Sequence, residues 1–159
     1  MAWVVGIGIF LLLLAAFPRF TIGLVALAGL GIFAIFTATN TANKRAAERR
    51  AMVVVSAGYD VQRCAPDYPV AVTITNRAPS TVSSTSFTLK GYASGHSDPI
   101  YDSGYGQYRD DRIIEPGNAW ATCWTVPRRA YNVSEQRAAA FPPSAVIWRA
   151  EDVSPAFRQ

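Results

Sequence analysis

The sequence predicts a transmembrane α-helical hairpin followed by an all-β sandwich domain. Residues 1–38 contain one charged side chain, Arg19, whereas charged residues make up 16% of the whole chain. A basic run follows at 44–50 (KRAAERR), and from residue 52 onward apolar side chains alternate with polar ones. These changes in composition predict three regions: a transmembrane hairpin over 1–39, a basic juxtamembrane segment over 40–51 and a β-sandwich domain over 52–159.

Two helices are predicted for the apolar region, over 2–17 and 20–38. Their 16 and 19 uncharged residues would form helices of about 24 and 28 Å, close to the roughly 30 Å of a bilayer core. A single helix over 2–38 would be about 55 Å long and would place Arg19 near the bilayer centre. Pro18 suits the first turn of a helix, so we expect Pro18-Arg19 to form the turn between two spans.

A cleaved signal peptide is the alternative interpretation of residues 1–17. This stretch has no basic residues at its start, and no small-residue cleavage site precedes a polar mature sequence. These features favour the membrane hairpin. Within its second helix the small residues Gly23, Ala26 and Gly29 would let the helix backbones approach closely.

The basic charge of the chain is concentrated next to the predicted hairpin. Of the net charge of +4, Arg19 contributes one unit and 44–50 contribute three, whereas 51–159 hold ten basic and ten acidic residues. A neutral domain lacks the positive surface that nucleic acids require, so no nucleic-acid partner is expected. The basic residues are instead expected to contact the headgroups of a lipid bilayer: Arg19, Lys44, Arg45, Arg49 and Arg50.

The second half of the chain shows the two-residue period of half-buried strands. Val70, Val72 and Ile74 alternate with small or polar residues, and Trp120, Thr122, Trp124 and Val126 do the same. Further strands are predicted over 52–55, 84–92 and 145–149. Turn residues separate them, including Glu115-Pro116-Gly117-Asn118. Six or seven short strands in about 100 residues predict an immunoglobulin-like (fibronectin III-like) sandwich.

Two segments have weaker patterns. Residues 94–111 (SGHSDPIYDSGYGQYRDD) are expected to form a long loop or an irregular hairpin. Residues 134–140 are expected to form a short helix with Ser134 as its N-cap.

The segments YPVAVTITNRAPSTVSSTSFTLKGYA (68–93) and IIEPGNAWATCWTVP (113–127) resemble FxLYD-type domains of small membrane-anchored bacterial proteins. The chain is also similar to uncharacterised two-helix bacterial proteins in which FPRF joins the helices. The resemblance implies a membrane-anchored sandwich and carries no catalytic residue over to this chain. The tyrosine-rich loop at 94–111 departs from the pattern.

No catalytic, metal or cofactor motif is found. His96 is the only histidine, and Cys64 and Cys123 lie 32 residues before it and 27 after it, without the spacing of a zinc site. The acidic residues of the 94–111 segment do not follow a calcium-loop pattern, and no phosphate-binding glycine loop is present. A hydrolase that uses His96 with a nearby serine or aspartate is kept as an alternative function.

Two signals disagree about the side of the membrane. A hairpin places both chain ends on one side, and the basic residues after the second helix favour the cytoplasm. Cys64 and Cys123 are candidates for one disulfide, which would favour the periplasm. We expect a bacterial inner-membrane protein with a cytoplasmic domain, and the periplasm is the alternative.

The expected function is that of a non-enzymatic accessory subunit. The predicted helices would pack on an integral-membrane complex, while the sandwich contacts a partner domain. Tyr101, Tyr105 and Tyr108 are the candidate contact residues, because tyrosine is favoured at interfaces. A free-standing envelope factor that binds peptide or lipid through the sandwich is a further alternative.

Overall fold

The computed structural model describes residues 18–104 and 108–158. The chain divides into two compact units, Met1–Ala46 and Ala47–Gln159. Helix α2 (Pro18–Ala51) begins in the first unit and ends in the second, and the strands all belong to the second unit.

Helix α2 is a single continuous helix of 34 residues. Pro18 stands at its start, where a missing N–H has no cost, and Arg49 and Arg50 occupy its last turn, where cations favour the helix dipole. The hydroxyls of Thr37 and Thr41 donate to backbone carbonyls three and four residues earlier, so these polar residues do not interrupt the helix. The helix ends where a β-branched run begins at Val53.

The predicted membrane hairpin is contradicted by the structure. Among the residues that the structure describes, no helix has both the length and the apolar composition needed to cross a membrane. This finding overturns the two predicted spans and the inner-membrane location derived from them. The sequence reasoning ended the helix near residue 38, but nothing in 39–50 terminates a helix, so polar and charged residues form the C-terminal part of α2.

The residues assigned to the hairpin are placed as follows. The predicted helix over 2–17 lies outside the described residues, as do the side chains of Arg19, Gly23 and Ala26. Gly29 is exposed on α2, and no atom lies within 4 Å of the position that a Cβ would take there. The basic side chains of the predicted juxtamembrane segment are exposed on the same helix: Lys44, Arg45, Arg49 and Arg50.

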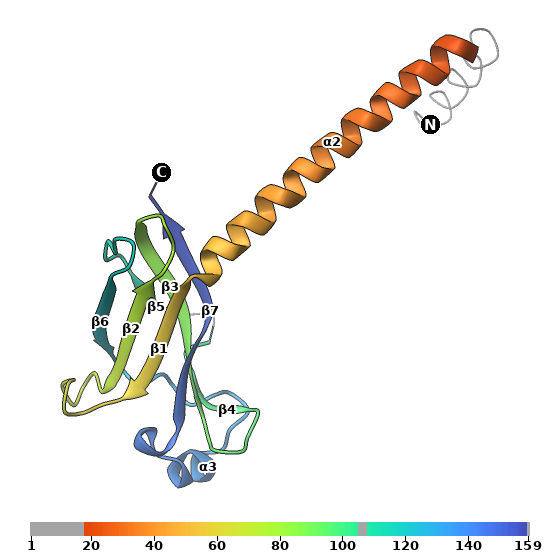
Figure 1. The fold of residues 1–159 in the computed structure, drawn as a ribbon. Helices are drawn as coiled ribbons and strands as arrows, with labels where there is room; N and C mark the ends of the chain where they lie inside the picture. Colours follow the sequence, from red (N-terminus) through yellow and green to blue (C-terminus); the bar gives the residue numbers. More distant parts are fainter. Residues whose placement is uncertain (1–17, 105–107, 159) are drawn as a thin grey trace. The chain divides into compact units, whose positions relative to one another are not determined.

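The second unit is a β-rich region with two antiparallel sheets (Figure 1). The first sheet has the order β1-β2-β6 and consists of β1 (Val53–Tyr59), β2 (Val70–Asn76) and β6 (Ala119–Trp124). The second sheet is built on β3 (Val82–Tyr92). Strands β4 (Pro99–Asp102) and β5 (Tyr108–Asp110) pair with one edge of β3, and β7 (Ile147–Phe157) pairs with the other.

Two short helical elements precede β7: α3 (Glu135–Ala140) and a 3₁₀ turn (Pro143–Ala145). The Ser134 hydroxyl accepts a hydrogen bond from the Arg137 backbone N–H, which is the predicted N-cap contact.

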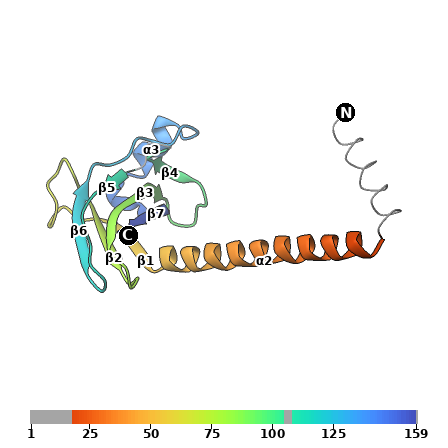
Figure 2. The same ribbon diagram turned by 90° about the horizontal axis from the view of Figure 1, so that it is seen from above.

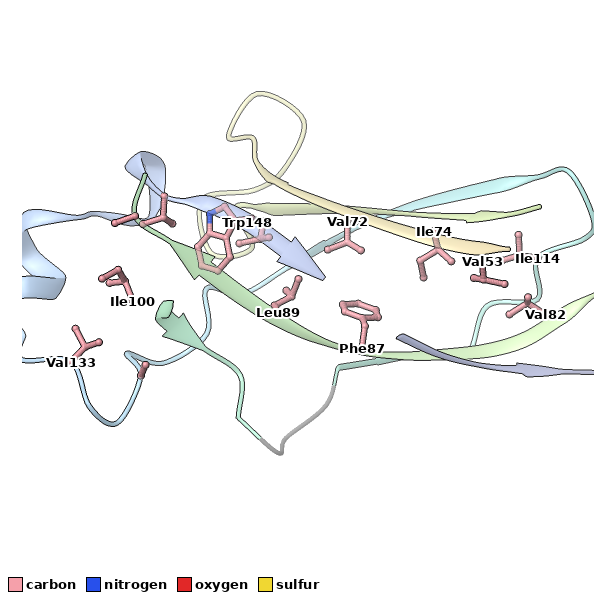
Figure 3. Close-up of a cluster of buried hydrophobic side chains, with 14 residues drawn as sticks. Val53, Val72, Ile74, Val82, Phe87, Leu89, Ile100, Ile114, Val133 and Trp148 are labelled. Carbon is pink, nitrogen blue, oxygen red and sulfur yellow. The ribbon is translucent and has the colours of Figure 1, made fainter. Parts of the chain in front are cut away.

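The core lies between the two sheets (Figure 3). Val72 and Ile74 of β2 face Phe87 and Leu89 of β3, and all four side chains are fully buried. The Trp148 side chain of β7 packs over Gly91, and the core continues beyond it to Ile100 and Val133 (Figure 3). Each fully buried side chain of this size stabilises the fold by about 1.5–3 kcal/mol.

Candidate functional site

One corner of the β-rich region is open. There a single stretch of chain pairs first with β3 of one sheet and then with β2 of the other. Residues 108–114 follow the edge of β3, where Phe87 is aligned with Tyr108 and Val82 exchanges backbone hydrogen bonds with Ile114. The chain then turns at 115–118, with Gly117 in the left-handed region (φ 78°), and returns as β6 in the other sheet. Figure 2 shows β5 and β6 at this side of the domain.

Three adjoining hollows lie along this corner, with volumes of about 230, 360 and 750 Å³. The first two share Arg112 and Trp120. The second and third adjoin through the contact between the Trp124 ring of the second and the Tyr108 ring of the third. We call the resulting surface, formed by residues 102–104, 108–115 and 118–131, the corner groove. Beyond β6 the chain crosses to the other sheet, where Asp102 donates its backbone N–H to the Arg128 carbonyl.

Aromatic side chains form the inner wall of the corner groove. Trp120 and Trp124 are half-buried, because they are aligned with the core residues Ile74 and Val70 of the neighbouring strand β2. The Trp124 ring packs edge-on against Tyr108, with 4.9 Å between the ring centroids. The Tyr108 hydroxyl donates to the Thr125 carbonyl at 3.2 Å. These contacts give the groove a rigid apolar wall at the point where the sheets separate.

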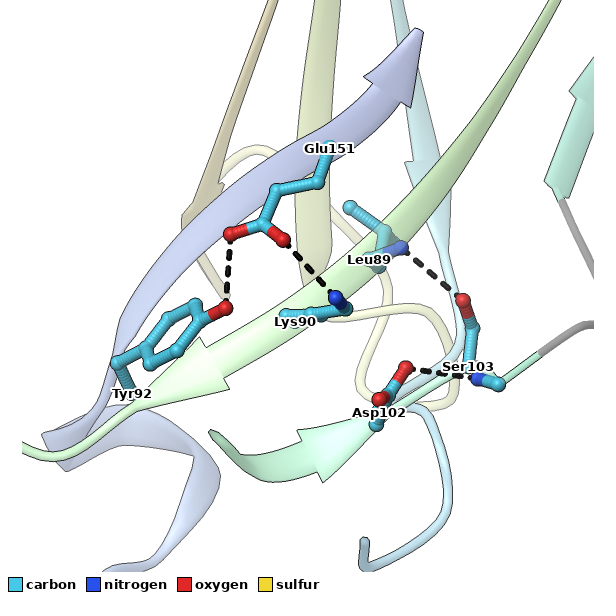
Figure 4. Close-up of polar contacts among 7 residues, drawn as sticks. Leu89, Lys90, Tyr92, Asp102, Ser103 and Glu151 are labelled. Carbon is cyan, nitrogen blue, oxygen red and sulfur yellow. Dashed lines mark hydrogen bonds and ion pairs between the residues drawn. The ribbon is translucent and has the colours of Figure 1, made fainter. Parts of the chain in front are cut away.

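The carboxylates of the corner groove are engaged by groups of the domain itself. Asp110 accepts hydrogen bonds from Trp120 Nε1 and the Arg112 backbone N–H, and Asp111 pairs with Arg109 at 2.7 Å. Asp102, at the edge of the third hollow, accepts from the Gly104 backbone N–H (Figure 4). Glu115, which lines the first hollow at the turn, accepts from the Thr81 hydroxyl.

Two arginines of the groove have no carboxylate within ion-pair distance in the described part of the chain. The Arg112 guanidinium lies over the Trp120 ring, 4.3 Å from its centroid. Arg128 is exposed and lines the third hollow. Arg112 flanks the beginning of β6, and Arg128 follows its end.

A disulfide joins Cys123 of β6 to Cys64 of the 60–69 loop, with Cα atoms 5.8 Å apart. Cys64 is buried, at 7% exposure. The bridge attaches the outer face of β6, opposite the tryptophans, to the loop between β1 and β2.

Of the three predicted contact tyrosines, the two that the structure describes do not share a surface. Tyr108 lines the corner groove, and Tyr105 lies outside the described residues. Tyr101 is half-buried away from the groove, where its ring stacks on Trp148 with 5.7 Å between the centroids and its hydroxyl donates to the Phe141 carbonyl. Burial raises the pKa of Tyr101.

His96 lies in the exposed turn after β3. Its Nδ1 is 3.4 Å from an Arg137 nitrogen, and its ring meets Phe141 with 6.0 Å between the centroids. Within the described residues, His96 forms no hydrogen bond with a serine or a carboxylate. The described part of the chain also contains no group of three side chains that could hold a metal ion.

A second polar cluster crosses strands β3 and β7 on the outer face of their sheet (Figure 4). Glu151 forms an ion pair with Lys90 at 2.9 Å and accepts a hydrogen bond from the Tyr92 hydroxyl at 2.7 Å. Burial, followed by the hydrogen bond to Glu151, raises the pKa of Tyr92 to about 12. The members of this cluster satisfy one another, so it joins two strands and leaves no free group for a ligand.

Sequence reasoning did not identify the corner groove. Trp120, Trp124 and Arg112 were each visible, but the tryptophans were read only as one face of a strand. The available signal was the uncharged strand AWATCW, but its position at a sheet edge became apparent only from the structure.

The comparisons with known proteins place this chain in no family. No protein-family model, no curated protein and no solved structure matches it. The resemblance to FxLYD-type domains therefore stays a prediction.

Proposed function

We propose that this chain is a non-enzymatic interaction protein whose β-rich domain binds a partner protein in the corner groove. The observation that supports this most directly is the composition of the groove: two half-buried tryptophans, a tyrosine, and an arginine that stacks on one of the tryptophans and has no carboxylate partner among the described residues. Tryptophan, tyrosine and arginine are the residues most enriched at the energetic centres of protein interfaces.

An exposed apolar residue of the groove gives a direct test. Ile113 lines the first hollow and is 54% exposed, whereas Val61, of similar size and 53% exposed, lies in the 60–69 loop outside the groove. The photoreactive residue benzoylphenylalanine would replace Ile113 in one full-length chain and Val61 in another. Both chains would be expressed in the native host and irradiated.

We expect a covalent adduct with a different protein at position 113 and none at position 61. The absence of any adduct at 113, or the same adduct at both positions, would contradict the proposal. Melting curves of the two purified chains would show that both remain folded.

The disulfide supports an oxidising compartment as the place where the domain acts, because such compartments preserve disulfides. Labelling the free thiols of this chain in extracts of the native host, with and without prior reduction, tests this part of the proposal. Reaction of Cys64 and Cys123 without a reductant would contradict it.

A further inference from the structure

We propose that the partner segment is an extended acidic peptide that adds as a strand to the free edge of β6, with carboxylates near both of its ends. This inference rests on the proposed function, since it names the chemistry and the binding mode of the partner in the corner groove. Three features support it: the backbone groups that β6 directs away from β2, the uncharged sequence of this strand, and the charges of the groove.

The backbone of β6 offers hydrogen-bonding groups along one side. Within the described residues β6 pairs with β2 alone, and the Asn76 N–H donates to the Asn118 carbonyl at the start of this ladder. Hydrogen-bonded positions alternate in an antiparallel ladder, so Trp120, Thr122 and Trp124 direct their N–H and C=O groups toward β2.

The residues between them therefore direct their backbone groups away from β2: Ala119, Ala121 and Cys123. The Thr125 carbonyl, next in this series, accepts the Tyr108 hydroxyl from the side opposite β2, as this alternation requires. An added strand would find three residues with free donors and acceptors.

The edge of β6 lacks the features that protect the other edges. Strand β7 carries Arg149, Glu151 and Pro155, and its residue Asp152 has a positive φ of 50° at an irregularity in the ladder. The edge of β1 lies beside β7 (Figure 1). By contrast, β6 reads AWATCW, with no charge and no proline. Unprotected edges pair readily with other strands, so an edge of this kind indicates that a partner strand covers it.

The charges of the groove select an acidic partner. Each carboxylate of the groove accepts a hydrogen bond from, or forms an ion pair with, another group of the domain. Arg112 and Arg128, by contrast, lack a carboxylate partner among the described residues. Arg112 lies over Trp120 near the beginning of β6, and Arg128 lines the third hollow beyond its end, so an added strand of six or more residues with acidic ends would bring a carboxylate toward each. The apolar wall between them would receive side chains from the middle of the peptide.

A second copy of this chain is a weaker match for the same edge. Its own β6 carries no carboxylate to offer to Arg112 or Arg128. Self-association through β6 is therefore an outcome that the experiment must separate from peptide binding.

A set of synthetic peptides tests the inference on the full-length chain. The probe has the middle Val-Thr-Val-Thr-Val with two aspartates at each end and a fluorescein label, and its binding is measured by fluorescence anisotropy at low salt. Lysines replace the aspartates in a second peptide. Two further peptides carry N-methyl groups on the valines or on the threonines, which removes the backbone donors of one side of the strand at a time.

We expect the acidic peptide to bind at least tenfold more tightly than the lysine peptide. One N-methylated peptide should lose binding and the other should keep it, because only one side of an added strand faces β6. Arg112→Ala and Arg128→Ala should each weaken binding at least threefold. Arg77→Ala is the matched control, because Arg77 is exposed and lies outside the groove, and it should have no effect.

Equal binding of the acidic and lysine peptides, or equal effects of the two N-methylated peptides, would overturn the inference. If Ile113 still crosslinked to a partner in that case, the proposed function would stand without it. Sedimentation of the free chain as a dimer that the acidic peptide does not dissociate would also overturn the inference, in favour of a second copy at β6.

Discussion

At the scale of single residues, Asn76 organises the turns at one end of the domain. It is fully buried, and its Nδ2 donates to the Ser80 and Ile114 carbonyls while its Oδ1 accepts from the Ala78 N–H. One side chain thereby holds together the β2–β3 connection and the segment that leads to β6. This role is not visible in the sequence, because the partner at Ile114 is 38 residues away.

Replacement of Asn76 by aspartate should destabilise the domain strongly. The new carboxylate oxygen would face two carbonyls in place of the amide donor, so Asn76→Asp should lower the free energy of unfolding by about 2–4 kcal/mol. Urea denaturation measures this change. Asn118→Asp, at an exposed position of the adjoining turn, is the control and should change it by less than about 0.5 kcal/mol. Similar losses for both variants would contradict the role given to the Asn76 amide.

The Glu151 cluster predicts how stability depends on pH. Burial raises the pKa of Glu151, but the hydrogen bonds from Lys90 and Tyr92 together outweigh it, so the pKa lies below its ordinary value of 4.5. A carboxyl with a depressed pKa in the folded state contributes stability above the unfolded pKa and loses it as pH falls through the folded value. Tyr92 acts in the other direction: its stabilisation is complete below pH 10 and is lost as pH rises toward 12.

Comparison with Glu151→Gln tests the acidic side of this profile. At pH 7 the native chain should be more stable than the variant by about 1 kcal/mol, since the pair is partly exposed. The difference should shrink as pH falls below 4.5, where the carboxylate becomes protonated. Thermal or urea unfolding of both chains between pH 3 and 7 measures it, and a difference that does not vary with pH would contradict the assignment.

At the scale of elements, the disulfide fastens β6, the strand that forms the groove, to the loop between β1 and β2. Its cysteines are 59 residues apart, and closing a loop of this length in the unfolded chain stabilises the fold by about 4 kcal/mol in the chain-entropy model. The double variant Cys64→Ser/Cys123→Ser should lose stability of this order in chemical denaturation. Addition of a reductant should destabilise the native chain and leave the variant unchanged. Equal stability of the two chains without reductant would contradict this prediction.

The predictability of each element follows from how local its signals are. Strands β2 and β6 were predicted well, because each has one buried face and therefore alternates in sequence. Strands β4 and β5, of four and three residues, were not predicted, because only their pairing with β3 makes them strands. The predicted last strand was too short, since β7 continues through Pro155, a residue that edge strands tolerate.

At the scale of the molecule, the division into two units predicts that the β-rich unit folds without the first one. A chain that begins at Ala47 keeps all seven strands and the disulfide. Its melting temperature should lie within about 2 °C of that of the full chain, a shift equivalent to less than about 0.5 kcal/mol. Calorimetry of both chains measures this, and the loss of a cooperative transition in the shorter chain would contradict it.

The sequence by itself determined the features whose information is local: helical structure over 20–38, the alternating strands and the turn at 115–118. Periodicity, helix propensity and turn chemistry act over a few residues, so they can be read along the chain. Only the tertiary structure decided which strand edges remain free and how Arg112, Trp120 and Arg128 come to share one groove. These features depend on contacts between distant segments, because an edge is free or covered only once both sheets have formed.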